Sequence, residues 1–261
     1  MIPFAILIPT RNRPEFVQRA VRWHRSQSDA RIIIADSSDP RHELTLMQWA
    51  GLRQIRTPGL NELEASAVAI KVITEQFTMF IGDDDLVFHS AIARAVAIMN
   101  ISDYLSAYGQ AIRFELHGGM IPYGRIEYAM PTLDLVFRVY QTSVLTEALI
   151  SARNLRFEER EPCFIRTVER HHCYHNGIHG HDPGLFLLRQ FHDGRTHVAK
   201  SRPSIRQRLG HAIPPLTRIN QWMRAKLDPD EITAASMRHK TSPYYKDWRE
   251  AEHFLSRGKD E

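Results

Sequence analysis

The chain has 261 residues, of which 25% are charged and 43% are apolar, and its formal net charge at pH 7 is +4. This composition is close to that of ordinary soluble proteins and excludes disordered and fibrous classes. The length allows one large α/β domain, or one domain with a short appendage, and is enough to bury a real core. A mild positive charge suits anionic partners such as nucleotide diphosphates, lipid head groups or nucleic acid, but it equally describes a solvated basic surface.

Cysteine content and hydropathy bear on the compartment. The two cysteines, Cys163 and Cys173, are too few for a disulfide framework and are typical of a reducing compartment. The first residues lack the basic region of a signal peptide, and no segment has the roughly 18 uninterrupted apolar residues of a membrane span. We therefore expect a cytoplasmic protein without a membrane span.

The first hundred residues alternate strand-like and helix-like segments. Pro14 fits the first position of a helix, where its missing N–H does no harm, and Asn61 is a plausible N-cap for a helix that reaches Ile73. We expect, in chain order, strands at 4–8, 31–35, 52–56 and 77–81, with helices from 14, at 44–49, at 61–73 and at 90–99 between and after them. Such alternation predicts a mostly parallel sheet flanked by helices, with ligands bound outside the carboxyl ends of the strands.

The second half is less regular, and its polar, His-rich residues 156–182 are typical of a long functional loop. Asp182 followed by Pro183 is a plausible start for a helix that reaches Phe191. The remaining expected elements are an extended segment at 103–116, strands at 135–140 and 197–200, a helix at 143–152, and a basic helical tail from 204 with helix starts at Asp228 and Ser242.

The strongest chemical signal is the acidic triplet Asp83-Asp84-Asp85, which follows the apolar run 77–81. Three adjacent carboxylates repel one another, which raises their pKa values unless a cation compensates. Mg²⁺ or Mn²⁺ would satisfy them, because these hard cations take one or two carboxylates together with phosphate oxygens. The alternative is an exposed acidic turn before a helix, where Asp is favoured anyway. The position at the end of a buried strand favours the metal.

Four segments, in this order, resemble family 2 glycosyltransferases, an inverting group with the GT-A fold. They are Ala5 to Arg13 (AILIPTRNR), Ile32 to Asp39 (IIIADSSD), Gly59-Leu60-Asn61 before an Ala-rich helix, and Phe80 to Leu86 (FIGDDDL), which resembles the DxD motif. A common family form carries an acid where this chain has Gly82. Four motifs in the family order are stronger support than any one alone.

The resemblance implies roles for individual residues at the carboxyl ends of these strands. Asp83 would lie near the donor ribose, and Asp84 or Asp85 would hold the metal. The base pocket would be lined by Pro9, Thr10, Arg11 and Asp36. Asn61 completes the expected nucleotide-sugar site, and the metal set is Asp83, Asp84 and Asp85 with Mn²⁺ or Mg²⁺ as cofactor.

An inverting transfer also needs a general base for the acceptor hydroxyl, and a carboxylate within hydrogen-bond reach suffices. In the family this acid follows the DxD motif by about a hundred residues and opens a helix. Asp182 fits that place, although a plain N-cap has an equal claim to it. Weaker candidates are Glu147, Glu158, Glu159 and Glu161.

Two further groups of residues carry weaker signals. The cluster His171, His172, Cys173, His175, His179 and His181 could bind zinc, but its spacing matches no familiar site, and lining an acceptor loop is the preferred interpretation. Basic residues after 200, such as Arg206 and Arg224, could contact a diphosphate or an anionic membrane surface at the inner face, or simply be solvated.

We therefore predict a metal-dependent glycosyltransferase that moves a sugar from a nucleotide-diphosphate donor to a glycan or lipid-linked acceptor for polysaccharide or glycoconjugate synthesis, with no nucleic-acid partner. The GT-A domain would span 1–203, with a nucleotide-binding half at 1–100 and an acceptor half at 101–203, and a helical basic extension would span 204–261. A catalytically idle GT-A-like module that binds a glycan or polyanion is the alternative. A sugar-phosphate nucleotidyltransferase ranks lower, because the loop after the first strand lacks glycine.

Overall fold

The computed structural model describes residues 2–42, 46, 49–101, 104–115, 123–127, 138–155, 179–191, 231–233, 249–251 and 253–254. The chain divides into two compact units: residues 1–111 with 128–188, and residues 112–127 with 189–261. The sequence-based boundary between residues 203 and 204 is a different division, and it stays a prediction. All the residues that build the site discussed below belong to the first unit.

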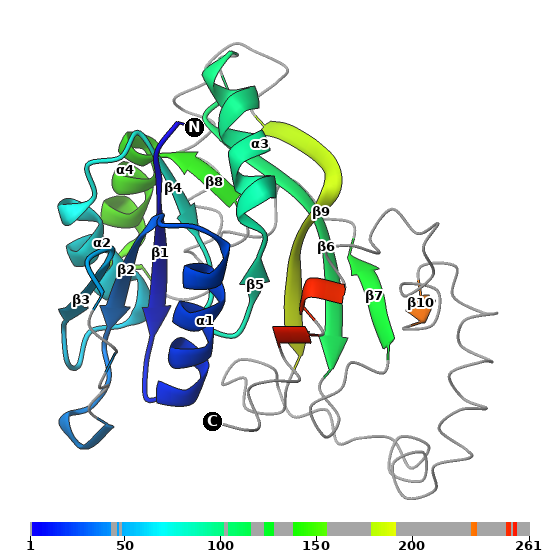
Figure 1. The fold of residues 1–261 in the computed structure, drawn as a ribbon. Coiled ribbons are helices and arrows are strands. Elements are labelled where there is room, and N and C mark those ends of the chain that lie inside the picture. The colour runs from blue at the N-terminus through cyan, green and yellow to red at the C-terminus, as the bar shows by residue number, and fades with distance from the viewer. Residues whose placement is uncertain are drawn as a thin grey trace, which may run out of the picture. The chain divides into compact units, whose positions relative to one another are not determined.

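The first unit is built on a six-stranded sheet (Figure 1). Its order is β6 (Ser106–Glu115), β8 (Arg138–Gln141), β4 (Phe77–Phe80), β1 (Phe4–Thr10), β2 (Arg31–Asp36) and β3 (Leu52–Arg56). The pairs β4–β1, β1–β2 and β2–β3 are parallel, whereas β8 is antiparallel to both of its neighbours. Of these six strands, β8 alone runs against the others, so the mostly parallel sheet expected from the sequence is confirmed.

Helices cover both faces of this sheet. Successive residues of a strand point to opposite faces, and the central strands are apolar on both, so each face has to be buried. Residues such as Leu7 and Ile33 pack with α2 (Glu62–Ala69) and α4 (Thr142–Ala152) in one buried cluster. On the other face lie α1 (Pro14–Gln27) and α3 (His89–Asn100) (Figure 1). Trp23 of α1 is fully buried there, and its indole N–H donates to the carbonyl of Val87, 2.8 Å away. This α/β fold with its parallel sheet confirms the predicted fold class.

Short elements connect these layers. Two single-turn 3₁₀ helices lie at Pro40–His42 and Ile70–Val72, and the second extends α2 nearly to Ile73, as the capping signal predicted. The two-residue strand β5 (Leu86–Val87) follows the acidic triplet directly and pairs with β9 (His179–Phe191), with Leu86 opposite Leu188. In the second unit, β7 (Tyr123–Glu127) pairs antiparallel with β10 (Glu231–Thr233).

Two of the helix predictions are wrong. The segment after Asp182 lies in strand β9, because its apolar run pairs with β5 rather than forming a helix of its own. The helix start expected at Asp228 gives way to strand β10 at Glu231–Thr233, paired with β7. Residues 249–251, 253 and 254 are helical, as the tail was predicted to be. The helix expected at 44–49 falls largely outside the described residues, and the strand expected at 197–200 lies wholly outside them. The loop expected at 156–182 lies outside them up to residue 178, and its last residues, 179–182, belong to strand β9 instead of a loop.

None of the helices within the described residues combines the length and the apolar character needed to cross a lipid bilayer.

Candidate functional site

The parallel register brings the ends of β1, β2 and β4 to one edge of the sheet. Thr10, the last residue of β1, lies opposite Asp36, the last residue of β2. Beyond β4, the amide of Ile81 still donates to the carbonyl of Leu7, at 3.1 Å, so the acidic triplet begins just past the same edge. The edge predicted to bind ligands is thus the place where four of the sequence-predicted residues, Thr10, Asp36, Asp83 and Asp84, gather.

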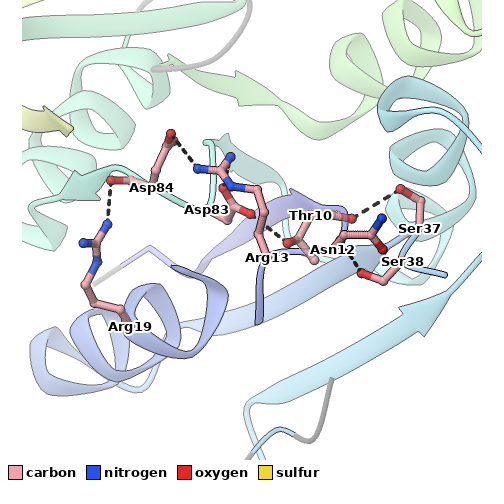
Figure 2. A network of polar contacts seen from close by, with 8 residues as sticks. All are labelled: Thr10, Asn12, Arg13, Arg19, Ser37, Ser38, Asp83 and Asp84. Atoms are coloured by element: carbon pink, nitrogen blue, oxygen red, sulfur yellow. Dashed lines mark hydrogen bonds and ion pairs between the residues drawn. The ribbon is translucent and has the colours of Figure 1, made fainter. Parts of the chain in front are cut away.

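The three carboxylates are buried rather than displayed in an exposed turn. The exposed fractions of Asp83, Asp84 and Asp85 are 3%, 7% and 2%. The hydroxyl of Thr10 donates to Asp83 Oδ2 at 2.7 Å, across 73 residues of sequence (Figure 2). The alternative of an exposed acidic turn is therefore wrong. Burying three acids is costly unless cationic partners lie close to them.

Arg13 supplies one such cationic partner. Its two terminal nitrogens contact Asp83 Oδ1 at 2.8 Å and Asp84 Oδ2 at 3.0 Å, so one guanidinium bridges two carboxylates (Figure 2). Such forked, charge-assisted contacts are among the stronger polar interactions in proteins. They fix the positions of the first two acids of the triplet relative to the start of α1.

Arg19 lies within α1, six residues after Arg13, and also approaches the triplet. One of its terminal nitrogens donates to the main-chain carbonyl of Asp84 at 3.1 Å. The ring of Phe16 lies under both guanidinium groups, with its centroid 4.3 Å from the Arg13 carbon and 5.2 Å from that of Arg19. Cation–π contact of this kind is attractive and holds a guanidinium in place. Residues 13, 16 and 19 thus form one stack, which we call the arginine stack.

Burial outweighs these partners at Asp83. It raises the pKa of the Asp83 carboxyl from 3.8 to about 7, although the Arg13 charge and the Thr10 hydrogen bond both act to lower that pKa. The charges of Asp84 and Glu62 raise the same pKa further. The Arg13 charge and the Thr10 hydrogen bond therefore do not offset the cost of burying the charged form of Asp83.

Gly82 keeps the other two carboxylates close. A Cβ atom at this position would lie 3.0 Å from Asp84 Oδ1 and 3.2 Å from Asp85 Oδ2. Both oxygens therefore converge on the space that the missing side chain leaves open. Oxygen donors of this type fit Mg²⁺ or Mn²⁺. Among the described residues no group of three or more His, Cys, Asp or Glu side chains could hold a metal ion, so a metal here would need oxygen atoms from a ligand as well.

Asp36 is held by residues of its own loop and of β3. Its Oδ1 accepts from the amide of Ser38 at 2.9 Å, and its Oδ2 accepts from the Gln54 side chain at 2.6 Å. Arg56 Nε lies 3.8 Å from the same Oδ2. The amide of Thr57 also donates to the main-chain carbonyl of Asp36, at 2.8 Å. A buried carboxylate with so many donors around it is fixed in orientation, as a recognition group has to be.

Asn12 locks the loop after β1 to the loop after β2. Its side chain exchanges two hydrogen bonds of 2.9 Å with Asp39. Its main-chain amide donates to Ser38 Oγ at 2.8 Å, as Figure 2 shows. Its φ of 55° lies in the left-handed region, which Asn tolerates better than most residues. The two loops that carry predicted base-pocket residues therefore behave as one piece.

The remaining predicted residues are placed as follows. Pro9 is buried in β1, and Arg11 is exposed in the loop after it. Asn61 forms a capping box with Glu64 at the start of α2, where its side-chain oxygen accepts from two amides, and its Nδ2 donates to the Arg153 carbonyl at 3.4 Å. Asp182 lies in β9, six residues before Leu188, so its reading as the N-cap of a helix is wrong, and its role as a base stays a prediction.

Among the cluster at 171–181, only residues 179–181 lie within the described part of the chain, in β9, so its role in metal binding or acceptor binding stays a prediction. Sequence reasoning missed the arginine stack and the lock at Asn12. Arg13 stood inside the first family-like segment, yet it received no role. A spacing of three residues places residue 13 beside 16 and residue 16 beside 19 at a helix start, and this signal could have identified the stack.

The sheet order, the flanking helices and the acidic edge define a GT-A-like glycosyltransferase fold. Solved structures of the S. aureus glycosyltransferase TarS share this fold. Its residues 1–349 match with a TM-score of 0.50 and 13% identity, over 72% of this chain and 60% of that one.

Two complexes of the same TarS fragment give similar values. The complex with UDP matches with a TM-score of 0.51 and 14% identity, over 72% of this chain, and the complex with UDP-GlcNAc matches with a TM-score of 0.50 and 13% identity, over 74%. This chain spans 60% of the length of these neighbours. No protein-family model matches the sequence, and no curated protein matches it either.

Proposed function

We propose that this protein is a metal-dependent glycosyltransferase of the family 2 type, which transfers a sugar from a nucleotide-diphosphate donor to a hydroxyl of a glycan or lipid-linked acceptor with inversion. The observation that carries the proposal is the buried cluster of Thr10, Arg13, Asp83 and Asp84 at the carboxyl edge of the sheet. Ligands of open α/β sheets bind at this edge. The four family-like segments and the fold shared with TarS support it.

The chemistry around Asp36 supports a uridine donor. A fixed, buried carboxylate accepts hydrogen bonds, so it selects a base with a ring N–H. Uracil and guanine have such an N–H at the edge that faces a pocket, whereas cytosine and adenine present an unprotonated ring nitrogen there. The TarS complexes with UDP and UDP-GlcNAc add support for UDP as the carrier. Pro9, Thr10 and Arg11 complete the proposed base pocket.

The triplet would serve the diphosphate end of the donor. Asp84 and Asp85 would hold Mn²⁺ or Mg²⁺, since their oxygens converge beside Gly82, and Asp83 would lie near the ribose. A bound divalent cation neutralises the charge that grows on the departing diphosphate. The guanidinium groups of Arg13 and Arg19 add positive charge at the same place, and fixed charges of this kind are worth most where water is excluded.

The acceptor hydroxyl has to lose a proton as it attacks the anomeric carbon. Asp182 is the proposed base, and Asp182→Asn would remove that function while keeping the side-chain volume. We expect transfer to fall by about a hundredfold or more, with donor binding unchanged, as is typical for the loss of a general base. An equal loss of donor binding would assign Asp182 to the donor site instead.

Thermal unfolding of the purified chain against nucleoside diphosphates, each with and without Mn²⁺, tests the proposal. A ligand that binds only the folded state raises the unfolding midpoint. We expect UDP with Mn²⁺ to give the largest rise. Asp84→Asn or Asp85→Asn should remove that rise, and Asp29→Asn, at an exposed carboxylate before β2, should leave it intact.

No rise with any nucleotide at any metal concentration would overturn the donor-site assignment. A rise with UDP and Mn²⁺, but no release of UDP from a UDP-sugar across a panel of acceptor glycans, would instead identify an idle binding module. Measured turnover therefore separates the enzyme from its catalytically inactive alternative.

A further inference from the structure

Arg13 already binds Asp84, one of the two carboxylates that the proposed cation requires, and Asp83 next to it. Its guanidinium bridges Asp83 Oδ1 and Asp84 Oδ2 at 2.8 and 3.0 Å. A divalent cation at Asp84 Oδ1 and a guanidinium at Oδ2 of the same carboxylate are both positive and repel each other strongly at such short range. Cation binding to Asp84 therefore requires Arg13 to move or to share its place at a cost in affinity.

The two arginines of the stack differ in their freedom to move. The Arg13 side chain is 28% exposed, whereas the side chains of its partners Asp83 and Asp84 are 3% and 9% exposed. Arg13 precedes the first residue of α1 and can turn toward solvent without disturbing the helix. Its carboxylate partners are fixed by burial, so any exchange of partners has to be made by Arg13.

Arg19 is anchored instead. It donates to a main-chain carbonyl, that of Asp84, rather than to a carboxylate. Its Nε is buried and is one of two such side-chain atoms, among those described, without a hydrogen-bond partner. Moving Arg19 would release the backbone of the triplet, whereas moving Arg13 would release the carboxylate oxygens of Asp83 and Asp84 and leave that backbone bond in place. The arginine stack thus contains one fixed and one exchangeable cation.

We propose that Arg13 is a resident counter-ion of the triplet that exchanges places with the metal. When the donor site is empty, its guanidinium binds Asp83 and Asp84. When the metal–nucleotide complex enters, the guanidinium moves to the diphosphate and binds its oxygens. The inference rests on the proposed function, and it adds that metal binding and nucleotide binding are coupled through Arg13. Metal alone has to displace Arg13 without compensation, whereas metal with nucleotide offers Arg13 a new anionic partner that suits its bidentate geometry. The exchange makes metal and nucleotide bind cooperatively.

Direct Mn²⁺ binding tests this exchange, followed by electron paramagnetic resonance or calorimetry with and without UDP. In the natural chain we expect weak Mn²⁺ binding alone and binding at least about fivefold tighter with UDP, in the usual range for coupled sites. Arg13→Gln should bind Mn²⁺ alone at least about fivefold tighter than the natural chain, and UDP should then add little. Arg53→Gln, at an exposed position on β3, removes the same charge and should behave like the natural chain.

An Arg13→Gln protein whose affinity for Mn²⁺ alone is unchanged or weaker overturns the exchange, provided that the natural chain binds Mn²⁺ with UDP. If the natural chain binds neither, the proposed function itself fails. Should Arg13→Gln not fold, Arg13→Lys decides. Lysine retains the charge without the fork, so it should tighten Mn²⁺ binding by a smaller factor, and no change at all would count against the exchange.

Discussion

At the scale of single residues, Gly82 is as informative as the acids that follow it. Its position matters because Asp84 and Asp85 both turn an oxygen toward the space beside its Cα. The family form with an acid at this place would put a carboxylate where this chain leaves room. The absence of a side chain is therefore part of the geometry of the triplet.

Gly82→Ala should weaken Mn²⁺-dependent nucleotide binding by about tenfold or more, because the new Cβ would meet Asp84 Oδ1 at 3.0 Å and displace it. The unfolding midpoint without ligand should change little, since the backbone at 82 is not in the left-handed region. Calorimetric titration with UDP and Mn²⁺ measures the first effect. Thermal unfolding of the empty protein measures the second.

Gly59→Ala is the matched control, and the opposite pattern is expected. Gly59 has a φ of 82° and nothing within 4 Å of its would-be Cβ. The substitution should lower the free energy of unfolding by about 1 kcal/mol through backbone strain, and it should leave ligand binding alone. If both substitutions act only on stability, Gly82 has no part in positioning the acids.

The identities of several site residues could be predicted from the sequence, but their partners could not. Thr10, Asp36 and the triplet stand directly after apolar runs, which is a local signal. The bond from Thr10 to Asp83 joins residues 73 apart, so it depends on β1 and β4 being neighbours. No local pattern carries that information, and the bridge from Arg13 to Asp83 and Asp84 depends on the same neighbouring strands.

At the scale of elements, the start of α2 depends on Asn61. Its side chain accepts from the amides of Leu63 and Glu64, and Glu64 in turn accepts from the amide of Asn61 at 2.7 Å. This arrangement accounts for Asn61 without any ligand. The predicted role of Asn61 in donor binding is a separate claim that the cap neither supports nor contradicts.

Asn61→Ala should lower the free energy of unfolding by about 1 kcal/mol, because two helix amides lose their acceptor. Asn61→Ser should recover most of that loss, since serine caps nearly as well. Urea unfolding measures both changes. The affinity for UDP then decides whether Asn61 also contacts the donor. If Asn61→Ser restores stability but not UDP binding, Asn61 contacts the donor as well as the helix.

The contact between α1 and α3 includes two buried histidines. His24 Nδ1 lies 3.0 Å from His89 Nε2, and His89 Nδ1 lies 2.6 Å from the Ser28 hydroxyl. Burial lowers the pKa of His89 to about 4 and lowers that of His24 well below 6.5, where the His89 ring adds to the effect. Both rings are therefore neutral in the folded protein near neutral pH.

Acid should destabilise the fold through this pair. The unfolded chain takes up protons near pH 6.5 and the folded chain does not, so the stabilisation is complete above that pH. It is lost as the pH falls from about 6.5 toward 4, by about 1.4 kcal/mol per pH unit for each ring that stays neutral. Urea unfolding at several pH values should show this slope, and His24→Gln should reduce it. His253→Gln, at an exposed position, should not.

Elements were predictable where their signals were local. Pro14 and Asn61 mark helix starts, and both helices begin as expected. The segment 183–191 carries an equally plausible helix start but forms a strand, because β5 offers it a partner. A short apolar run has no period that separates the two states, so the decision falls to pairing between distant segments.

At the scale of the whole molecule, the sequence predicted the parallel sheet and the edge that carries the site. It did not predict that β8 runs against its neighbours, since nothing in a four-residue strand encodes its direction. The division into two units was likewise not visible, because the second unit joins residues 112–127 to the chain from 189 onward.

The net charge of +4 favours association with anionic surfaces. We expect the protein to sediment with vesicles that contain phosphatidylglycerol and not with neutral vesicles, and about 0.5 M salt should release it because charges are then screened over a few ångströms. Equal binding to neutral vesicles would exclude an electrostatic contact. No binding to either would leave a free glycan as the proposed acceptor.

The lock between Asn12 and the Ser38-Asp39 turn has a consequence for engineering. Two stretches of chain that a designer would treat as separate modules, 10–13 and 36–39, share five hydrogen bonds that involve Asn12 or Thr10 and the β2 turn. Grafting either stretch alone from a relative with another nucleotide preference would leave hydrogen-bond donors and acceptors of the other stretch without their partners. A transplant that alters base preference therefore has to carry both stretches together, as a single cassette.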